Sequence, residues 1–246
     1  MILSHKHRFV FIKGRKVAGT STEMLLSRIC GPEDIATPFM AADERLRIAF
    51  GAQAQNYTAE PGHEAAYRAL VTQFEPAQFA QLRLPRGRYY NHMPLREVQA
   101  LAGPLLGYRV IVAERSPYAK LISWINMFQS ETAYRRGEPM RGDPSKFAKQ
   151  LDRMLAAGRA DIARNIDLYR DASGRFAAEV LRHDSLQHDV DAFLASLGVE
   201  SAPLPHAKRG LGSEQFDPTT LFRRDQLDRI NMLYAEEFET FGFPTL

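Results

Sequence analysis

The sequence predicts an α/β fold with a central, mainly parallel β-sheet flanked by α-helices. Two stretches carry this prediction, because each places a short apolar strand before a loop and a helical pattern. Residues 8–13 precede a helix that starts after Thr20, and residues 108–113 precede a helix that runs to Phe128. Strands that alternate with helices are typical of layered α/β folds. With 246 residues and 45% hydrophobic side chains, we expect one domain over residues 1–246.

Further elements follow from apolar patterns and from breaks at glycine and proline. Residues 88–92 form a third strand candidate, and a helix is expected at about 95–101. The stretch 31–61 is irregular and is expected to connect elements. In the C-terminal half we expect one more strand at 179–182 and helices at 144–157, 163–169, 185–197 and 219–238.

Charge and cysteine content narrow the class of protein. Lys and Arg number 32 against 29 Asp and Glu, and this weak basic excess suits an anionic ligand without requiring nucleic acid. The single cysteine, Cys30, excludes an internal disulfide and indicates a reducing compartment, so a cytoplasmic location is expected. No apolar run resembles a signal peptide or a transmembrane segment, and a soluble chain is expected.

The loop after the first strand is a candidate phosphate-binding loop. Residues 14–21 read Gly-Arg-Lys-Val-Ala-Gly-Thr-Ser. At a helix start, backbone N–H groups and the positive end of the helix dipole converge on an anion. Lys16 supplies a positive charge, and the hydroxyls of Thr20 and Ser21 are expected to cap the helix and donate to phosphate oxygens. An ordinary strand-to-helix turn with a surface lysine is the alternative.

The spacing within this loop points away from a kinase and toward another family. In a Walker A sequence the lysine stands directly before the hydroxyl residue, whereas Lys16 precedes Thr20 by four positions. A strand followed by Lys-Val-Ala-Gly-Thr-Ser resembles the 5′-phosphosulfate-binding loop of sulfotransferases that use 3′-phosphoadenosine-5′-phosphosulfate (PAPS), especially the carbohydrate (Golgi-type) branch and its bacterial relatives. Arg15 stands where that family usually has proline. The resemblance implies a P-loop-like fold, a catalytic role for Lys16, and PAPS binding by Arg15, Lys16, Val17, Ala18, Gly19, Thr20 and Ser21.

The second strand leads into another candidate anion site. Arg115 follows the strand, Pro117 marks a helix start, and Ser123 lies within the second turn, where it can share an anion with the arginine. The pattern Arg-x-Pro-Tyr-x-Lys-x-x-Ser is similar to the family's 3′-phosphate-binding motif, which implies that Arg115 and Ser123 bind that phosphate. Ser116 and Lys120 replace the residues that are common there, Asp and Arg. A surface arginine and a helix hydroxyl bonded to its own backbone are the alternative.

His92 is the candidate catalytic base among seven histidines. It ends the predicted strand 88–92, and strand carboxyl ends face the ligand crevice of an open α/β sheet. An acceptor hydroxyl needs a base of near-neutral pKa to take its proton. The carbohydrate sulfotransferases use a similar His-x-Pro segment, so the resemblance implies this role for His92.

A basic, Pro/Gly-rich loop at 202–213 is a weaker candidate. It contains Lys208, Arg209 and Gly210, and the resemblance implies that such a loop covers the nucleotide and its 3′-phosphate. A solvated loop with two cations is the alternative. The segment 233–243 is similar to the family's C-terminal helix and is expected to pack on the core.

Together these features predict an enzyme that transfers a sulfuryl group from PAPS to a hydroxyl of a glycan or glycolipid and releases 3′-phosphoadenosine-5′-phosphate (PAP). No metal ligand set is evident in the sequence, and no metal is expected. Two alternatives stay open: a kinase that uses ATP and Mg²⁺ with an atypical loop, and an inactive nucleotide-binding protein on the same fold.

Overall fold

The computed structural model describes residues 1–85, 87–131, 142–205 and 216–246. Their strands form a five-stranded sheet in the order β3-β1-β2-β4-β5. The strands are β1 (Ile2–Ser4), β2 (Phe9–Ile12), β3 (Ile35–Ala36), β4 (Arg109–Glu114) and β5 (Glu179–Arg182). The central strands β2, β4 and β5 are parallel, whereas β1 is antiparallel to both β2 and β3. The expected sheet flanked by helices is confirmed, but it is mixed and parallel only in its centre.

Successive side chains of each strand enter two separate cores. Phe9 and Phe11 of β2 pack into one core with α1 (Gly19–Ser27) and α9 (Leu186–Ser196). The short strand β2 is therefore buried on both faces, as expected of a central strand in a parallel region.

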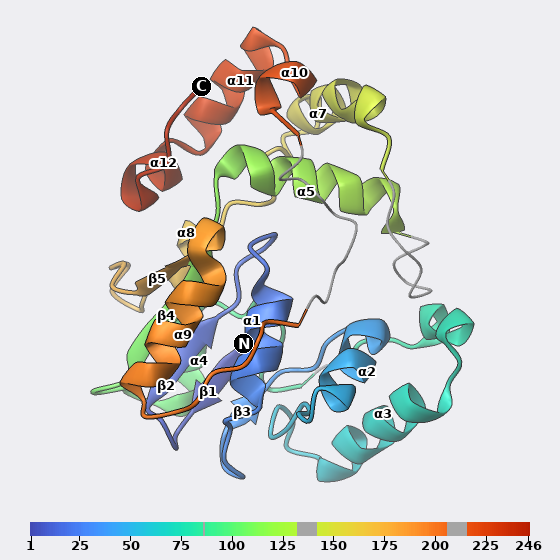
Figure 1. Cartoon of the computed structure of the whole chain (residues 1–246), viewed down its shortest axis with the longest axis vertical. Coiled ribbons are helices and arrows are strands. Elements are labelled where there is room, and N and C mark those ends of the chain that lie inside the picture. Colours follow the sequence, from blue (N-terminus) through green and yellow to red (C-terminus); the bar gives the residue numbers. More distant parts are fainter. Residues whose placement is uncertain (86, 132–141, 206–215) are drawn as a thin grey trace.

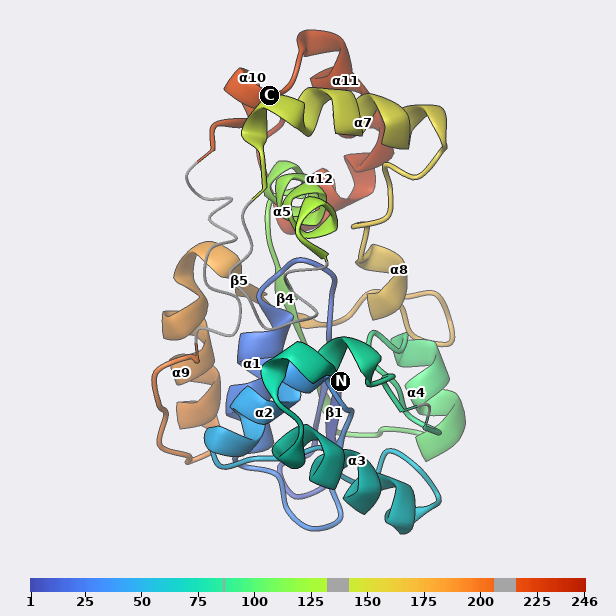
Figure 2. The same cartoon turned by 90° about the vertical axis from the view of Figure 1, so that its right-hand side faces the viewer.

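The opposite face of the sheet carries the larger core. Val10 and Ile12 of β2 pack there with α4 (Leu95–Ala102) and α8 (Ile166–Tyr169). This core continues into the helices above the carboxyl ends of β2 and β4 (Figures 1 and 2). Those helices are α5 (Pro117–Gln129), α7 (Phe147–Ala156), α10 (Pro218–Leu221), α11 (Arg224–Leu233) and α12 (Ala235–Phe241).

A small helical unit lies beside the β3 edge of the sheet (Figure 1). It consists of α2 (Ala41–Ala49), α3 (Pro61–Gln73) and the short 3₁₀ helix Pro76–Gln81, which share a core of their own. The stretch 31–61 was expected to be an irregular connection, and instead contains β3 and α2. No helix was predicted where α3 lies.

The strand predicted at 88–92 is wrong. Strand β2 already has β1 and β4 as neighbours, so this segment has no place beside it in the sheet. It lies against another loop, where the Tyr89 N–H donates to the Tyr57 carbonyl at 2.9 Å. His92 has a φ of 61°, which is incompatible with an extended strand.

Two predicted C-terminal helices are shorter or divided. The helix expected at 219–238 is split into α10, α11 and α12. The helix expected at 163–169 begins only at Ile166, because the backbone N–H groups of Asn165 and Ile166 donate to the carboxylate of Glu237. The strand at 179–182 and the helices near 95–101 and 185–197 are confirmed within a residue, whereas the helix expected at 144–157 consists of a 3₁₀ helix at Pro144–Lys146 followed by α7.

Candidate functional site

The two predicted anion-binding segments leave the sheet side by side. β2 and β4 are parallel neighbours in which Ile12 pairs with Val112. The loops that follow them therefore emerge at the same carboxyl edge, which is where open α/β sheets bind ligands. Helices α1 and α5 both begin after these loops. The two segments therefore start next to each other at this edge of the sheet.

The candidate phosphate-binding loop has an uncommon backbone. Lys16 and Ala18 adopt φ values of 63° and 59°. For a non-glycine residue this left-handed conformation costs on the order of 1–3 kcal/mol, and such strain clusters at ligand sites. Of the five non-glycine residues with positive φ in the described part of the chain, three are Lys16, Ala18 and His92. The strain of the described backbone is therefore concentrated at the predicted site.

Helix α1 begins directly after this loop. Its first residue is Gly19, and its N-cap, Ala18, makes no side-chain capping hydrogen bond. The expectation that Thr20 and Ser21 cap the helix is wrong, because both lie inside the first turn. The N–H groups of a first helical turn are the groups that bind anion oxygens at helix starts.

Lys16 reaches from the loop to α5. Its Nζ lies 3.3 Å from the Sδ of Met127. Ser123 lies four residues before Met127, so both are on the same side of α5. Arg115 and Ser123 are 6% and 4% exposed, and both are thus almost fully covered by protein. Lys16 thus contacts the helix that carries Ser123, while Arg115 and Ser123 themselves are buried.

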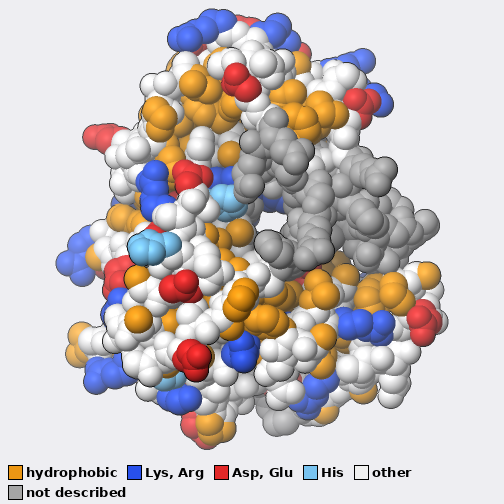
Figure 3. Space-filling model, in the orientation of Figure 1, with side chains coloured by type: hydrophobic (Ala, Val, Ile, Leu, Met, Phe, Trp, Pro, Cys, Tyr) orange, Lys and Arg blue, Asp and Glu red, His pale blue; other side chains and the backbone are white. Residues whose placement is uncertain are grey.

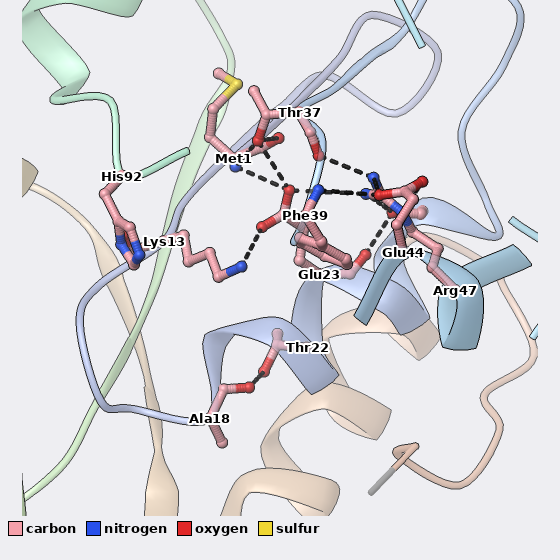
Figure 4. A network of polar contacts seen from close by, with 11 residues as sticks. Met1, Lys13, Ala18, Thr22, Glu23, Thr37, Phe39, Glu44, Arg47 and His92 are labelled. Atoms are coloured by element: carbon pink, nitrogen blue, oxygen red, sulfur yellow. Dashed lines mark hydrogen bonds and ion pairs between the residues drawn. The ribbon is translucent and has the colours of Figure 1, made fainter. Parts of the chain in front are cut away.

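His92 lies directly beside the start of the loop (Figure 4). Its Nδ1 is 2.9 Å from the backbone oxygen of Lys13. A carbonyl oxygen only accepts hydrogen bonds, so Nδ1 carries the proton and Nε2 keeps its lone pair. This tautomer lets His92 take a proton at Nε2.

The ionisation of His92 is shifted by its surroundings. The pKa of His92 is lowered to about 3, mainly by burial. The positive charges of Lys13, the Met1 amino group and Arg15 also lower this pKa, whereas the hydrogen bond to the Lys13 backbone raises it. The imidazole is therefore neutral at pH 7. It is partly exposed, so this base is not sealed inside the protein.

A buried ionic cluster lies next to the loop and was not predicted. The Nζ of Lys13 is 3.3 Å from the Oε2 of Glu23 and 4.1 Å from the ring centre of Phe39. Glu23 also contacts the Met1 amino group at 2.9 Å, and Arg47 lies 3.9 Å away (Figure 4). Burial alone would raise the pKa of Glu23, but these three cations outweigh it and lower the pKa to about 2. The sequence signal that could have pointed to this cluster is Lys13, a lysine that directly follows the buried strand β2.

Asn165 fixes the middle of the phosphate-binding loop. The Arg15 N–H donates to Asn165 Oδ1 at 2.7 Å, and Asn165 Nδ2 donates back to the Arg15 carbonyl at 3.1 Å. Gly14 approaches α8, the helix that follows Asn165, so closely that a Cβ on Gly14 would lie 2.1 Å from the Tyr169 hydroxyl. A side chain separated from Arg15 by 150 positions gives no local sequence signal of this contact.

Other predicted site residues lie outside the described residues. These are Lys208, Arg209 and Gly210, so the loop that was expected to cover the nucleotide stays a prediction. On the face that Figure 3 shows, a His side chain and Lys or Arg side chains lie near the centre of the molecule. Among the described ranges, no His, Cys, Asp and Glu side chains form a group suited to hold a metal ion.

Comparison with known proteins finds no matching family model, no matching curated protein and no matching solved structure. In the part of the chain that the structure describes, no helix has both the length and the apolar character needed to cross a membrane.

Proposed function

We propose that this protein is a sulfotransferase with a P-loop-like fold, which transfers the sulfuryl group of PAPS to a hydroxyl of a glycan or glycolipid. The observation that carries this proposal is the meeting of three features at one sheet edge. They are the strained loop before α1, the neutral imidazole of His92 beside it, and helix α5. On α5, Ser123 lies on the same side of the helix as Met127, which Lys16 contacts.

The proposed binding mode uses both segments that follow β2 and β4. The first turn of α1 and the ammonium of Lys16 hold the phosphosulfate, because both direct positive charge at an anion. Arg115 and Ser123 hold the 3′-phosphate, and binding requires their local cover to open, since both are now buried. The basic residues Lys208 and Arg209 contribute to the cover of the nucleotide in this proposal.

The proposed transfer is an in-line displacement at sulfur. His92 Nε2 accepts the proton of the acceptor hydroxyl as the hydroxyl oxygen forms its bond to sulfur, and the bond between sulfur and the 5′-phosphate oxygen breaks. Lys16 and the first-turn amides stabilise the negative charge that develops on the leaving phosphate oxygen. The sulfuryl group ends on the acceptor, and PAP leaves.

The cations around His92 suit a base that acts only when the donor is bound. Lys13 and Arg15 help to hold the pKa of His92 well below its ordinary value in the free protein. A bound polyanion offsets such positive charges and raises the pKa of a nearby imidazole toward neutrality. In this proposal, donor binding makes His92 a stronger base than it is in the free protein, while burial, the largest cause of its low pKa, remains.

A transfer assay tests the proposal. The protein is incubated with PAPS labelled on its sulfuryl group and with a panel of glycans and glycolipids, and label is followed into the acceptor. Wild type is expected to transfer label without added metal, and His92→Asn to lose about 100-fold or more of the rate at similar PAP affinity. Transfer that survives His92→Asn would remove the base from the mechanism. Phosphate transfer from ATP that requires Mg²⁺ would favour the kinase instead.

A further inference from the structure

A continuous chain of buried hydrogen bonds links the two predicted anion-binding segments. Asn165 binds both the N–H and the carbonyl of Arg15, and its Nδ2 also donates to Glu114 Oε1 at 2.8 Å. The second oxygen of this carboxylate, Glu114 Oε2, accepts the N–H of Arg115 at 3.0 Å. Asn165 and Glu114 are both 0% exposed. Two side chains thus connect the backbone of Arg15 to the backbone of Arg115.

The orientation of the Asn165 amide is fixed by its partners. Its Oδ1 faces an N–H donor, and its Nδ2 faces two oxygen acceptors, the Arg15 carbonyl and the Glu114 carboxylate. A flipped amide would place a donor against a donor and an acceptor against two acceptors. Since Nδ2 has two hydrogens, both are used, and the bridge has one stable arrangement.

Further buried groups hold this bridge in place. The Lys120 Nζ lies 2.8 Å from Glu114 Oε2 and 2.6 Å from Glu237 Oε2. The Tyr169 hydroxyl donates to Glu114 Oε1 at 2.8 Å, and the Asn165 backbone N–H donates to Glu237. Removing one member of such a network leaves buried polar groups unpaired, so alternative arrangements are costly. The bridge is therefore built to keep a fixed length.

We propose that Asn165 and Glu114 act as a spacer that sets the separation of the two anion-binding segments, so that the protein selects ligands carrying two phosphate groups over ligands carrying one. A ligand that spans two sites gains fully from the second contact only if both sites stand at the right separation before it binds. The inference rests on the proposed function and names the ligand class of the same site. Both residues are positioning residues, because they act on ligands through the backbones of Arg15 and Arg115.

The test compares ligands with one and with two phosphates by calorimetric titration. PAP is the bisphosphate, and adenosine 5′-monophosphate and adenosine 3′-monophosphate are the matched monophosphates. Asn165→Ala is expected to weaken PAP binding by about tenfold or more and the binding of either monophosphate by less than about threefold. Gln226→Ala is the control, since the fully buried amide of Gln226 on α11 binds the Ala148 carbonyl and Asp152 of α7 and should leave all three affinities unchanged.

A second set of variants, in which positions 165 and 114 exchange donor and acceptor, tests the spacer if Asn165→Ala folds poorly. Asn165→Asp alone sets two carboxylates against each other, whereas Asn165→Asp combined with Glu114→Gln keeps the net charge and restores a donor and an acceptor between the two positions. The single variant is expected to lose the preference for PAP, and the double variant to recover part of it, because the contact between the two positions returns while the Arg15 carbonyl still lacks the donor that Asn165 supplies.

Three results would overturn the spacer. Equal weakening of bisphosphate and monophosphate binding by Asn165→Ala would show a general effect on the fold and leave the proposed function standing. A double variant that folds like wild type and yet prefers PAP no more than Asn165→Asp does would contradict the exchange argument. Wild type that binds PAP no better than the monophosphates would overturn the spacer and the proposed function together.

Discussion

The Nδ1 of His92 lies 2.9 Å from the backbone oxygen of Lys13, the first residue after β2. This hydrogen bond ties the candidate base to the strand that leads into the phosphate-binding loop. It also fixes the tautomer, because only a protonated Nδ1 can donate to a carbonyl. The position of the base and the position of the anion site therefore depend on the same few residues.

The pKa of His92 predicts how its contribution to stability changes with pH. Burial lowers this pKa from the ordinary 6.5 to about 3, so between these values the unfolded chain binds a proton that the native protein does not. The contribution of His92 to the free energy of unfolding is thus present above pH 6.5 and is lost as the pH falls toward 3. Urea unfolding should show wild type losing more stability than His92→Asn between about pH 7 and pH 4.5. Parallel pH profiles for the two proteins would contradict the lowered pKa.

Removal of the Lys16 ammonium should weaken anion binding selectively. Because Lys16 projects from the loop toward α5, Lys16→Ala is expected to reduce PAP affinity by about 10- to 100-fold, the loss typical of one charge-assisted contact. The control is Lys146→Ala, since Lys146 is exposed and paired with Asp143 outside this edge of the sheet. Calorimetric titration measures both. Equal affinities of Lys16→Ala and Lys146→Ala would exclude Lys16 from the site.

The buried carboxylate of Glu23 should be essential for stability. Glu23→Gln leaves Lys13 and the Met1 amino group without their shared counter-charge in a buried site, although Arg47 keeps Glu44, and this is expected to cost about 3–5 kcal/mol of the free energy of unfolding. Glu33→Gln on the exposed surface should stay within about 0.5 kcal/mol of wild type. Denaturant titrations of both variants give the comparison. A loss below about 1 kcal/mol for Glu23→Gln would mean that the cluster is hydrated and weakly coupled.

The close approach of Gly14 to α8 predicts that no larger residue is tolerated there. A Cβ on Gly14 would lie 2.1 Å from the Tyr169 hydroxyl and 2.9 Å from Asn165 Nδ2. Gly14→Ala should therefore cost about 1–3 kcal/mol through overpacking and also weaken PAP binding, because Arg15 follows directly. Gly62→Ala is the matched control, since a Cβ on Gly62 meets nothing within 4 Å. Thermal unfolding of both variants, with and without PAP, measures the two effects. Unchanged unfolding of Gly14→Ala would show that the loop is not fixed against α8.

The elements that could be predicted from the sequence are those with a long run of apolar residues that ends at a glycine or proline. β2 and β4 each have several apolar residues in a row, and Gly14 and Pro117 mark the change to loop and helix. β1 and β3 have only three and two residues, which is too short for a periodic signal. The antiparallel half of the sheet therefore could not be predicted, and the sheet was expected to be more parallel than it is.

The candidate site was predictable only where its residues follow strands directly. Lys16 and Arg115 come after β2 and β4, so the emergence of their two loops at one edge of the sheet follows from the parallel pairing of the strands. His92 was reached through a wrong strand, and its actual position depends on a hydrogen bond to Lys13, 79 positions away. Asn165 has no local pattern, because its role arises from contacts between distant segments. Such tertiary contacts are invisible to sequence periodicity.

The most direct test of the sulfotransferase proposal is a calorimetric titration of wild type and Arg115→Ala with PAP, and with ATP in the presence of Mg²⁺. Wild type is expected to bind PAP without metal and to prefer PAP to ATP, and Arg115→Ala is expected to weaken PAP binding by about tenfold or more. No PAP binding, or an equal preference for ATP with Mg²⁺, would contradict the sulfotransferase proposal and bring the kinase to the front.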